Sequence, residues 1–446
     1  MPLFEYPELA FTQIAFLVLS VIWFLKRNDE IPLIISSFLF YVASYRYWAV
    51  EHGINQWIKL SWFISKPITQ EAALEALMYI TLGEICLLST YMLCQRRSLA
   101  VAIPPSDRSV LQWLRPKTLL LGLFCLPLVI LTRSQIATQL SAGSSLAFQI
   151  NNYLYLFPFA LVGIAILVVC LWRFGAITSL INKVMALSIL TSVFYLTFGS
   201  QARFQFLGWM IAAGIIVSSF YRPKIRLALL TLSLILAMAV FAISGAMRNP
   251  NIANQSLNQI ALERALGAED ANMLDGFVLL KNVYPEQLDF RWGMEHLEIF
   301  IRPIPRAWWP EKPVGGYMNK LGFTIAGGRG TVGISPTIFG SFYAEIGLFG
   351  ILFFAPLYGL VIAKVVRYST QLQPFAGVLV RAILCSSLIP LLRGGDLAGI
   401  YAWIGMAFWP CFLLLWMKRR NLTLRMYPST HPYPSNPHPP MRLPHS

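Results

Sequence analysis

The chain has 446 residues, of which 57% are hydrophobic and only 12% are charged, and its mean hydropathy is +0.60. About a quarter of the residues in a soluble globular domain are charged, so this composition excludes a soluble protein of this length. The net charge is +15, and basic loops that orient membrane helices explain it better than nucleic acid binding does. We therefore expect the lipid bilayer to be the solvent and no nucleic acid to be a partner.

Apolar runs recur along the whole chain, and most are long enough to cross a hydrocarbon core of about 30 Å. The fold class that they predict is an all-α polytopic membrane protein with about eleven transmembrane helices. The predicted spans are 8–25, 31–48, 73–94, 117–132, 152–172, 183–199, 204–221, 225–244, 337–363, 375–392 and 398–417. The domain organisation is then helices 1–8 within 1–244, a long polar loop at 245–336 and helices 9–11 within 337–417.

The ends of these runs differ in their Lys and Arg content. Basic residues concentrate in one alternating set of loops, which holds Lys26, Arg27, Arg96, Arg97, Arg108, Arg115, Lys117, Arg173, Lys183, Arg222, Lys224, Arg226, Lys364, Arg367, Lys418, Arg419 and Arg420. Cytoplasmic loops carry the excess of Lys and Arg, so we expect this set to be cytoplasmic. The long loop is then extracytoplasmic. The basic, proline-rich tail at 418–446 is predicted to be cytoplasmic and disordered.

The long loop at 245–336 has two amphipathic stretches followed by an irregular one. Apolar residues recur at helical spacing over 255–283, and a second short amphipathic stretch runs from Phe290 to Arg302. Prolines from Pro303 to Pro313 and several glycines after them then exclude a regular helix. An irregular loop at a membrane face is where a binding site is often built.

Arginine dominates on the predicted outer side, against the trend that places basic residues inside. The residues are Arg133, Arg203, Arg248, Arg264, Arg291, Arg302, Arg306, Arg329 and Arg393. A guanidinium binds phosphate oxygens through two parallel hydrogen bonds, so converging arginines suit a pyrophosphate on a lipid carrier. The alternatives are a solvated outer face for most of them and interfacial anchoring for Arg203 and Arg393.

Two longer segments and two short turns carry a family resemblance. Residues 302–313 read RPIPRAWWPEKP and residues 335–350 read SPTIFGSFYAEIGLFG, while Arg203 and the Arg393-Gly394-Gly395-Asp396 sequence lie in turns between apolar runs. Together with the span count and the single long loop, they resemble the bacterial O-antigen polymerase (Wzy-type) family of oligosaccharide repeat-unit polymerases. The resemblance covers about residues 180–410.

This resemblance implies a membrane glycosyltransferase of the C type in the bacterial cytoplasmic (inner) membrane. Such an enzyme transfers a growing glycan from undecaprenyl pyrophosphate to a sugar hydroxyl of a new lipid-linked repeat unit. Donor and acceptor are then both undecaprenyl-pyrophosphate-linked oligosaccharides, and a flippase and a chain-length regulator are the expected protein partners. Neither a cofactor nor a metal ion is expected, because fixed guanidinium groups can stabilise the leaving pyrophosphate.

The expected site residues fall into two groups. Those expected to bind substrate are Arg203, Arg248, Arg302, Arg306, Trp308, Trp309, Lys312, Arg329 and Arg393. The acceptor hydroxyl benefits from a general base, for which Glu345 and Asp396 are the candidates. Glu345 has an alternative role as the ion-pair partner of a loop arginine. His296 is a third candidate for the base on the outer side, and the alternative is that it is a surface histidine without a catalytic role.

Other functions use a similar architecture. An O-antigen ligase has the same substrate class, and it is expected to carry a functional histidine in its long outer loop, where His296 is the only histidine. A lipid-linked oligosaccharide flippase or another transporter predicts repeated halves and charges at several helix centres, which this sequence lacks. A non-catalytic scaffold of an export complex does not need arginines at loop turns.

Overall fold

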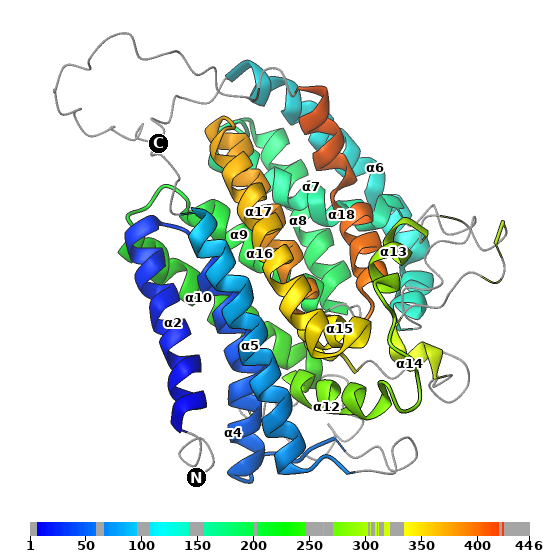
Figure 1. Cartoon of the computed structure of the whole chain (residues 1–446). Coiled ribbons are helices and arrows are strands. Elements are labelled where there is room, and N and C mark those ends of the chain that lie inside the picture. Colours follow the sequence, from blue (N-terminus) through cyan, green and yellow to red (C-terminus); the bar gives the residue numbers. More distant parts are fainter. Residues whose placement is uncertain are drawn as a thin grey trace.

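The computed structural model describes residues 7–58, 67–95, 108–141, 156–199, 203–246, 262, 271–301, 304, 308–309, 311, 316–321, 334–418 and 422. Every regular element within them is a helix (Figure 1). The helices before the long loop are α2 (Pro7–Arg27), α3 (Ile31–Leu39), the π-helix η1 (Phe40–Tyr45), α4 (Arg46–Glu51), α5 (Gln70–Gln95), α6 (Arg108–Ser141), α7 (Leu156–Arg173), α8 (Leu180–Gly199), α9 (Arg203–Ser218) and α10 (Pro223–Ala246). Those that follow are α12 (Met273–Val283), α13 (Met294–Ile301), α14 (Tyr317–Lys320), α15 (Thr337–Ile346), α16 (Leu348–Thr370), α17 (Pro374–Arg393) and α18 (Leu397–Met417).

Seven helical stretches in the described part of the chain are long and apolar enough to cross a membrane. They are Ile31–Glu51, Gln70–Gln95, Arg108–Ile130, Pro223–Val240, Leu348–Thr370, Pro374–Arg393 and Leu397–Met417. The all-helical, multi-pass prediction is therefore supported, but the expected count of eleven spans is not. Three further predicted spans correspond to shorter apolar stretches within α7, α8 and α9, namely Phe157–Arg173, Leu180–Tyr195 and Phe206–Ser218.

The predicted ninth span, 337–363, is wrong as a single helix. The chain breaks at Gly347, where φ is +64°, and the break separates the short α15 from the long α16. A left-handed φ of this kind ends a helix and favours glycine. Only α16 is long enough to cross the membrane, so Glu345 lies in a short helix beside the start of a transmembrane helix rather than inside one.

The predicted cytoplasmic loops meet at one end of the bundle. Arg226, at the start of α10, donates a hydrogen bond of 2.8 Å to the Asn28 carbonyl beyond the end of α2. Other contacts at this end join Arg367 to the Cys94 carbonyl, Arg173 to the Val217 carbonyl, Arg115 to the Ala176 carbonyl, and Lys418 to the Trp113 ring. The basic residues of six predicted loops thus share one end, which we call the basic end.

The opposite end, here the loop end, is closed by α12 (Figure 1). Asp275 of α12 is fully buried and accepts bonds of 3.0 and 2.8 Å from Arg46, which is 1% exposed. Asp275 also accepts a bond from the Ile58 backbone amide. Since a buried charge is stable only when it is paired, this bidentate pair fixes α12 against α4.

Each amphipathic stretch of the long loop contains a helix. The predicted helix at 255–283 corresponds to α12 over its second half, and the stretch from Phe290 corresponds to α13. Most of 255–270 and almost all of the tail at 418–446 lie outside the described residues. All six cysteines are free; four are buried, while Cys86 and Cys94 are half-buried.

Candidate functional site

Three segments that are far apart in the sequence converge at the loop end: α15, the turn between α17 and α18, and α13. Gly394 forms a parallel bridge with Thr337, and the Gly395 amide donates a bond of 2.9 Å to the Ser341 hydroxyl. The Leu397 amide donates to the Glu295 carboxyl at 3.3 Å. The resemblance segment 335–350 and the Arg393–Asp396 turn are therefore direct neighbours, and the loop helix α13 packs against both.

Glycine is required at the centre of this contact. Gly394 has φ +68°, and a Cβ atom there would lie 2.1 Å from the Thr337 carbonyl oxygen, which is far inside van der Waals contact. Gly395, next in the chain, has φ +107°. The Gly-Gly pair thus supplies both the left-handed backbone and the space that the close approach of α15 needs.

Glu345 is the buried anchor of this arrangement. Its side chain is fully buried, and its carboxylate accepts bonds from the Gly293 amide at 2.7 Å and the Glu295 amide at 3.1 Å. These amides belong to the start of α13, where unpaired N–H groups and the helix dipole favour a negative charge. The carboxylate also bonds to His296 Nδ1 at 2.8 Å. Each Glu345 oxygen therefore already has a partner, which leaves Glu345 poorly placed to act as a base itself.

His296 is held in one orientation by its neighbours. A carboxylate can only accept, so the 2.8 Å contact with Glu345 places a proton on Nδ1. The imidazole stacks on Phe354 with a centroid separation of 4.1 Å and an interplanar angle of 7°. Its Nε2 is buried and has no hydrogen-bond partner among the described residues. A neutral histidine in this state offers the Nε2 lone pair, which is the geometry of a general base.

Further charged groups surround the histidine–glutamate pair. Arg291 pairs with Glu298, and Lys320 of α14 lies in the same electrostatic neighbourhood. The pKa of Glu295 is raised to about 8. Burial raises it most, and the negative charges of Glu345 and Asp396 also raise it, while the positive charges of Arg291 and Lys320 lower it. Burial, together with the nearby Arg291 charge, lowers the pKa of Lys320. Within the described residues, no group of three or more His, Cys, Asp or Glu side chains is arranged to hold a metal ion.

The remaining predicted residues that are described take several positions. Asp396 accepts a bond of 3.0 Å from the Gly399 amide and so caps the start of α18, which gives it a structural role. Arg393 is the last residue of α17, directly before the Gly-Gly pair. Trp308 is 76% exposed, and Trp309 is 38% exposed.

Six predicted binding residues have side chains outside the described part of the chain. Arg248, Arg302, Arg306, Lys312 and Arg329 fall between described segments, and for Arg203 only the backbone is described, as the first residue of α9. Their proposed role in binding therefore stays a prediction.

Sequence reasoning underrated His296 and did not single out Glu295 or Lys320. His296 and Glu345 are 49 residues apart, and no local pattern links them. The usable signal was the Trp292-Gly293 pair, at which φ is +53° and +86°, directly before a helix with Glu and His in its first turn. The free amides of such a turn bind an anion, and the buried carboxylate of Glu345 is the anion that they bind.

No family model, curated protein or solved structure matches this chain significantly.

Proposed function

We propose that this protein is a membrane glycosyltransferase that polymerises lipid-pyrophosphate-linked oligosaccharide repeat units of a surface polysaccharide. The observation that carries the proposal is the convergence of the 335–350 segment, the Arg393–Asp396 turn and α13 around the His296–Glu345 pair. The 335–350 segment and the Arg393–Asp396 turn, two of the parts that carry the family resemblance, contribute to one site, and that site holds a base of suitable geometry. The apolar helices place the protein in the membrane, where a lipid-linked substrate also resides.

In the proposed reaction His296 acts as the general base and Glu345 as its positioning residue. Nε2 takes the proton from the attacking sugar hydroxyl of the acceptor, and the hydroxyl oxygen forms a bond to the anomeric carbon of the donor glycan. The bond between that carbon and the pyrophosphate oxygen breaks, and the pyrophosphate leaves with the electron pair. Glu345 stabilises the imidazolium that forms, because its carboxylate already accepts the Nδ1 hydrogen bond.

The arginines complete the proposed site. Negative charge develops on the pyrophosphate as the bond breaks, and guanidinium groups fixed nearby lower the energy of that transition state. Arg393 lies beside the Gly-Gly turn that contacts α15, and Arg302 and Arg306 follow α13 by one and five residues. In this proposal these three arginines bind the leaving pyrophosphate, and Trp308 and Trp309 bind the sugar rings.

An O-antigen ligase is the second candidate, and His296 is the observation that favours it. A ligase uses the same lipid-linked donor but delivers the glycan to a lipid A core. A histidine in the outer loop, oriented by a carboxylate and with no hydrogen-bond partner at its buried Nε2 among the described residues, suits that reaction equally well.

Deletion of the gene, followed by gel analysis of the surface glycans, separates the two candidates. A polymerase predicts that the long-chain ladder disappears while one repeat unit stays attached to its acceptor. A ligase predicts that all repeats are lost from the core while lipid-linked polymer accumulates. An unchanged ladder would contradict both.

A further inference from the structure

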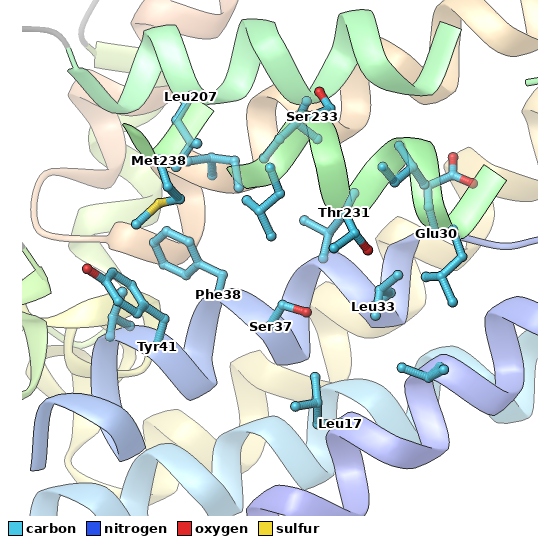
Figure 2. Close-up of a pocket in the computed structure, with 18 of the residues that line it drawn as sticks. Leu17, Glu30, Leu33, Ser37, Phe38, Tyr41, Leu207, Thr231, Ser233 and Met238 are labelled. Atoms are coloured by element: carbon cyan, nitrogen blue, oxygen red, sulfur yellow. The ribbon is translucent and has the colours of Figure 1, made fainter. Parts of the chain in front are cut away.

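An apolar cavity of about 480 Å³ lies away from the candidate site, between α2, α3, η1, α9 and α10 (Figure 2). Its volume is within the range of small-molecule binding sites. Leucine, isoleucine, valine, phenylalanine and methionine side chains make up most of its wall, and the polar residues are few, namely Glu30, Ser37, Tyr41, Thr231 and Ser233. Such a wall suits a hydrocarbon chain.

The lining of the cavity extends along one helical stretch. Its lining follows the helix from Glu30, near the basic end, to Val42. Twelve residues of helix rise about 18 Å, which is close to the half-thickness of a hydrocarbon core about 30 Å thick. Along α3 and η1 the lining therefore extends about the depth of one leaflet, counted from the basic end, and it also includes Ala271, which precedes α12. This matches an acyl chain of a phospholipid in that leaflet.

The two helices that flank the cavity face the bilayer. On α10, Leu232, Ile235 and Leu236 are exposed, and on α2, Val18, Leu19 and Ile22 are exposed. Thr231, which lines the cavity, belongs to the same exposed side of α10. A lipid chain can thus enter sideways from the membrane between α2 and α10.

Basic side chains lie at the end of the bundle where Glu30 lines the cavity. Lys26 and Arg27 end α2, while Arg222 and Lys224 lie at the start of α10, and all four are exposed. The two helix ends are held together by Arg226, which donates two bonds of 2.8 Å to Asn28. The two basic pairs therefore lie at the same end of the bundle as Glu30 of the cavity lining, although none of the four lines the cavity itself.

The one carboxylate in the cavity wall does not oppose an anion. Glu30 accepts bonds from Arg226 at 2.8 Å and from Arg381 at 2.7 Å, so its charge is neutralised. Arg226 is 4% exposed and its Nε has no hydrogen-bond partner among the described residues. Its charge is balanced by Glu30, but the Nε–H is a buried donor without an acceptor near this end of the cavity.

We propose that an anionic phospholipid binds between α2 and α10, with one acyl chain in the cavity and its phosphate at Lys26, Arg27, Arg222 and Lys224. Basic pockets between transmembrane helices recognise anionic headgroups through local charge. This lipid is a resident of the leaflet at the basic end, not the glycan carrier that reacts at the loop end. The proposal does not depend on the polymerase assignment.

Lipid titration of the full-length protein in detergent tests the headgroup site. Native mass spectrometry measures the binding of dioleoyl phosphatidylglycerol and of dioleoyl phosphatidylcholine. The anionic lipid is expected to bind more tightly. Arg222→Gln with Lys224→Gln should weaken its binding about 25-fold, roughly fivefold for each charge removed, and leave the zwitterionic lipid unchanged. The matched control is Lys183→Gln with Lys364→Gln, which removes two exposed charges on α8 and α16 and should have no effect.

Filling the cavity tests the acyl-chain site. Thr231→Trp, or Ser37→Phe as a second variant, should reduce phosphatidylglycerol binding at least tenfold. Leu187→Trp, on the exposed side of α8, should leave it intact. The melting temperature of each variant in phosphatidylcholine confirms folding.

Three results would overturn the proposal. They are equal affinity for the two phospholipids, full binding by both folded cavity variants, and displacement of phosphatidylglycerol by a lower concentration of a polyprenyl phosphate. The last result would assign the cavity to a carrier lipid instead.

Discussion

At the scale of single residues, the proposed base and the residue that positions it can be separated by mutation. His296→Gln removes the proton acceptor but leaves the carboxylate of Glu345 and its two backbone donors in place. We expect transferase activity to fall at least about 100-fold, since a general base contributes that much or more, while abundance and melting temperature stay near normal. Activity and the melting curve of one purified variant are the measurements.

Glu345→Gln should differ because an amide nitrogen cannot accept the second backbone N–H. A buried donor without a partner costs about 1–3 kcal/mol, so both stability and activity should fall. His52→Gln is the matched control, as His52 is exposed at the loop end away from α13. A fully active His296→Gln variant would return the role of base to Glu345 or Asp396.

The arginines that are proposed to bind the pyrophosphate are tested by substitutions that keep the positive charge but remove the guanidinium geometry. Arg302→Lys, Arg306→Lys and Arg393→Lys each keep a cation but lose the two parallel donors. Polymer yield is expected to drop at least tenfold in each variant, with unchanged protein levels in the membrane. Arg108→Lys, at the exposed start of α6, should have no effect. If all three variants remain fully active, these residues are solvated or anchor the chain at the interface.

The buried carboxyl of Glu295 predicts a pH dependence of stability. Its pKa in the folded protein is raised to about 8, above the ordinary value of 4.5, so the folded state holds a proton that the unfolded state releases. Stability should therefore fall as the pH rises between about 4.5 and 8, by at most about 1.4 kcal/mol per pH unit.

The matched variants are Glu295→Gln, which should remove this slope, and Glu71→Gln, which should keep it because Glu71 is exposed at the start of α5. Melting temperatures from pH 5 to pH 8.5 measure the effect. The same slope in wild type and Glu295→Gln would show that another group is responsible.

At the scale of elements, the contact between α15 and the α17–α18 turn depends on Gly394. An alanine there has both a left-handed φ of +68° and a Cβ 2.1 Å from the Thr337 oxygen. Gly175 separates these effects, because its φ is +71° but nothing lies within 4 Å of an added Cβ. We expect Gly175→Ala to cost about 1 kcal/mol from strain alone, and Gly394→Ala to cost several times more and to abolish activity. Equal costs in denaturant titrations would mean that α15 does not need this close approach.

The sequence was informative about helices and poor at pairing them. Apolar runs identified the long helices because each is apolar over a membrane's thickness, as in α5 and α16. The break at Gly347 was missed because the run from Phe342 to Phe354 is mostly apolar on both sides of this glycine. Contacts such as Arg46 with Asp275 join residues more than 200 positions apart, and no period in one sequence encodes them.

The candidate site shows the same division. Composition and turn chemistry indicated Glu345, Arg393 and the Gly-Gly pair, because a charge or a glycine pair inside apolar sequence needs a reason. They could not show that the Glu345 carboxylate already accepts hydrogen bonds from backbone amides at the start of α13. Assignment of the base to His296 needed the three-dimensional arrangement.

At the scale of the whole molecule, the two ends of the bundle have different chemistry. Lys and Arg of six predicted cytoplasmic loops gather at the basic end, whereas α12, α13 and the Gly-Gly turn lie at the loop end (Figure 1). A lipid-linked donor that reaches the loop end meets the candidate site, while the proposed phospholipid binds beside the basic end. The separation allows one lipid to stabilise the helices without competing with the other.

The orientation of these ends in the membrane is the last prediction. Cytoplasmic loops hold the excess of Lys and Arg, so the basic end should face the cytoplasm and α13 should face the outside. Single cysteines at Leu297 and Tyr221, both exposed, report on the two ends once the six native cysteines are replaced by alanine or serine. In intact cells a membrane-impermeant maleimide should label Leu297→Cys and not Tyr221→Cys, and permeabilised cells should give labelling of both. Labelling of Tyr221→Cys alone in intact cells would reverse the orientation, place the His296–Glu345 pair in the cytoplasm, and remove the basis for a polymerase that acts outside the membrane.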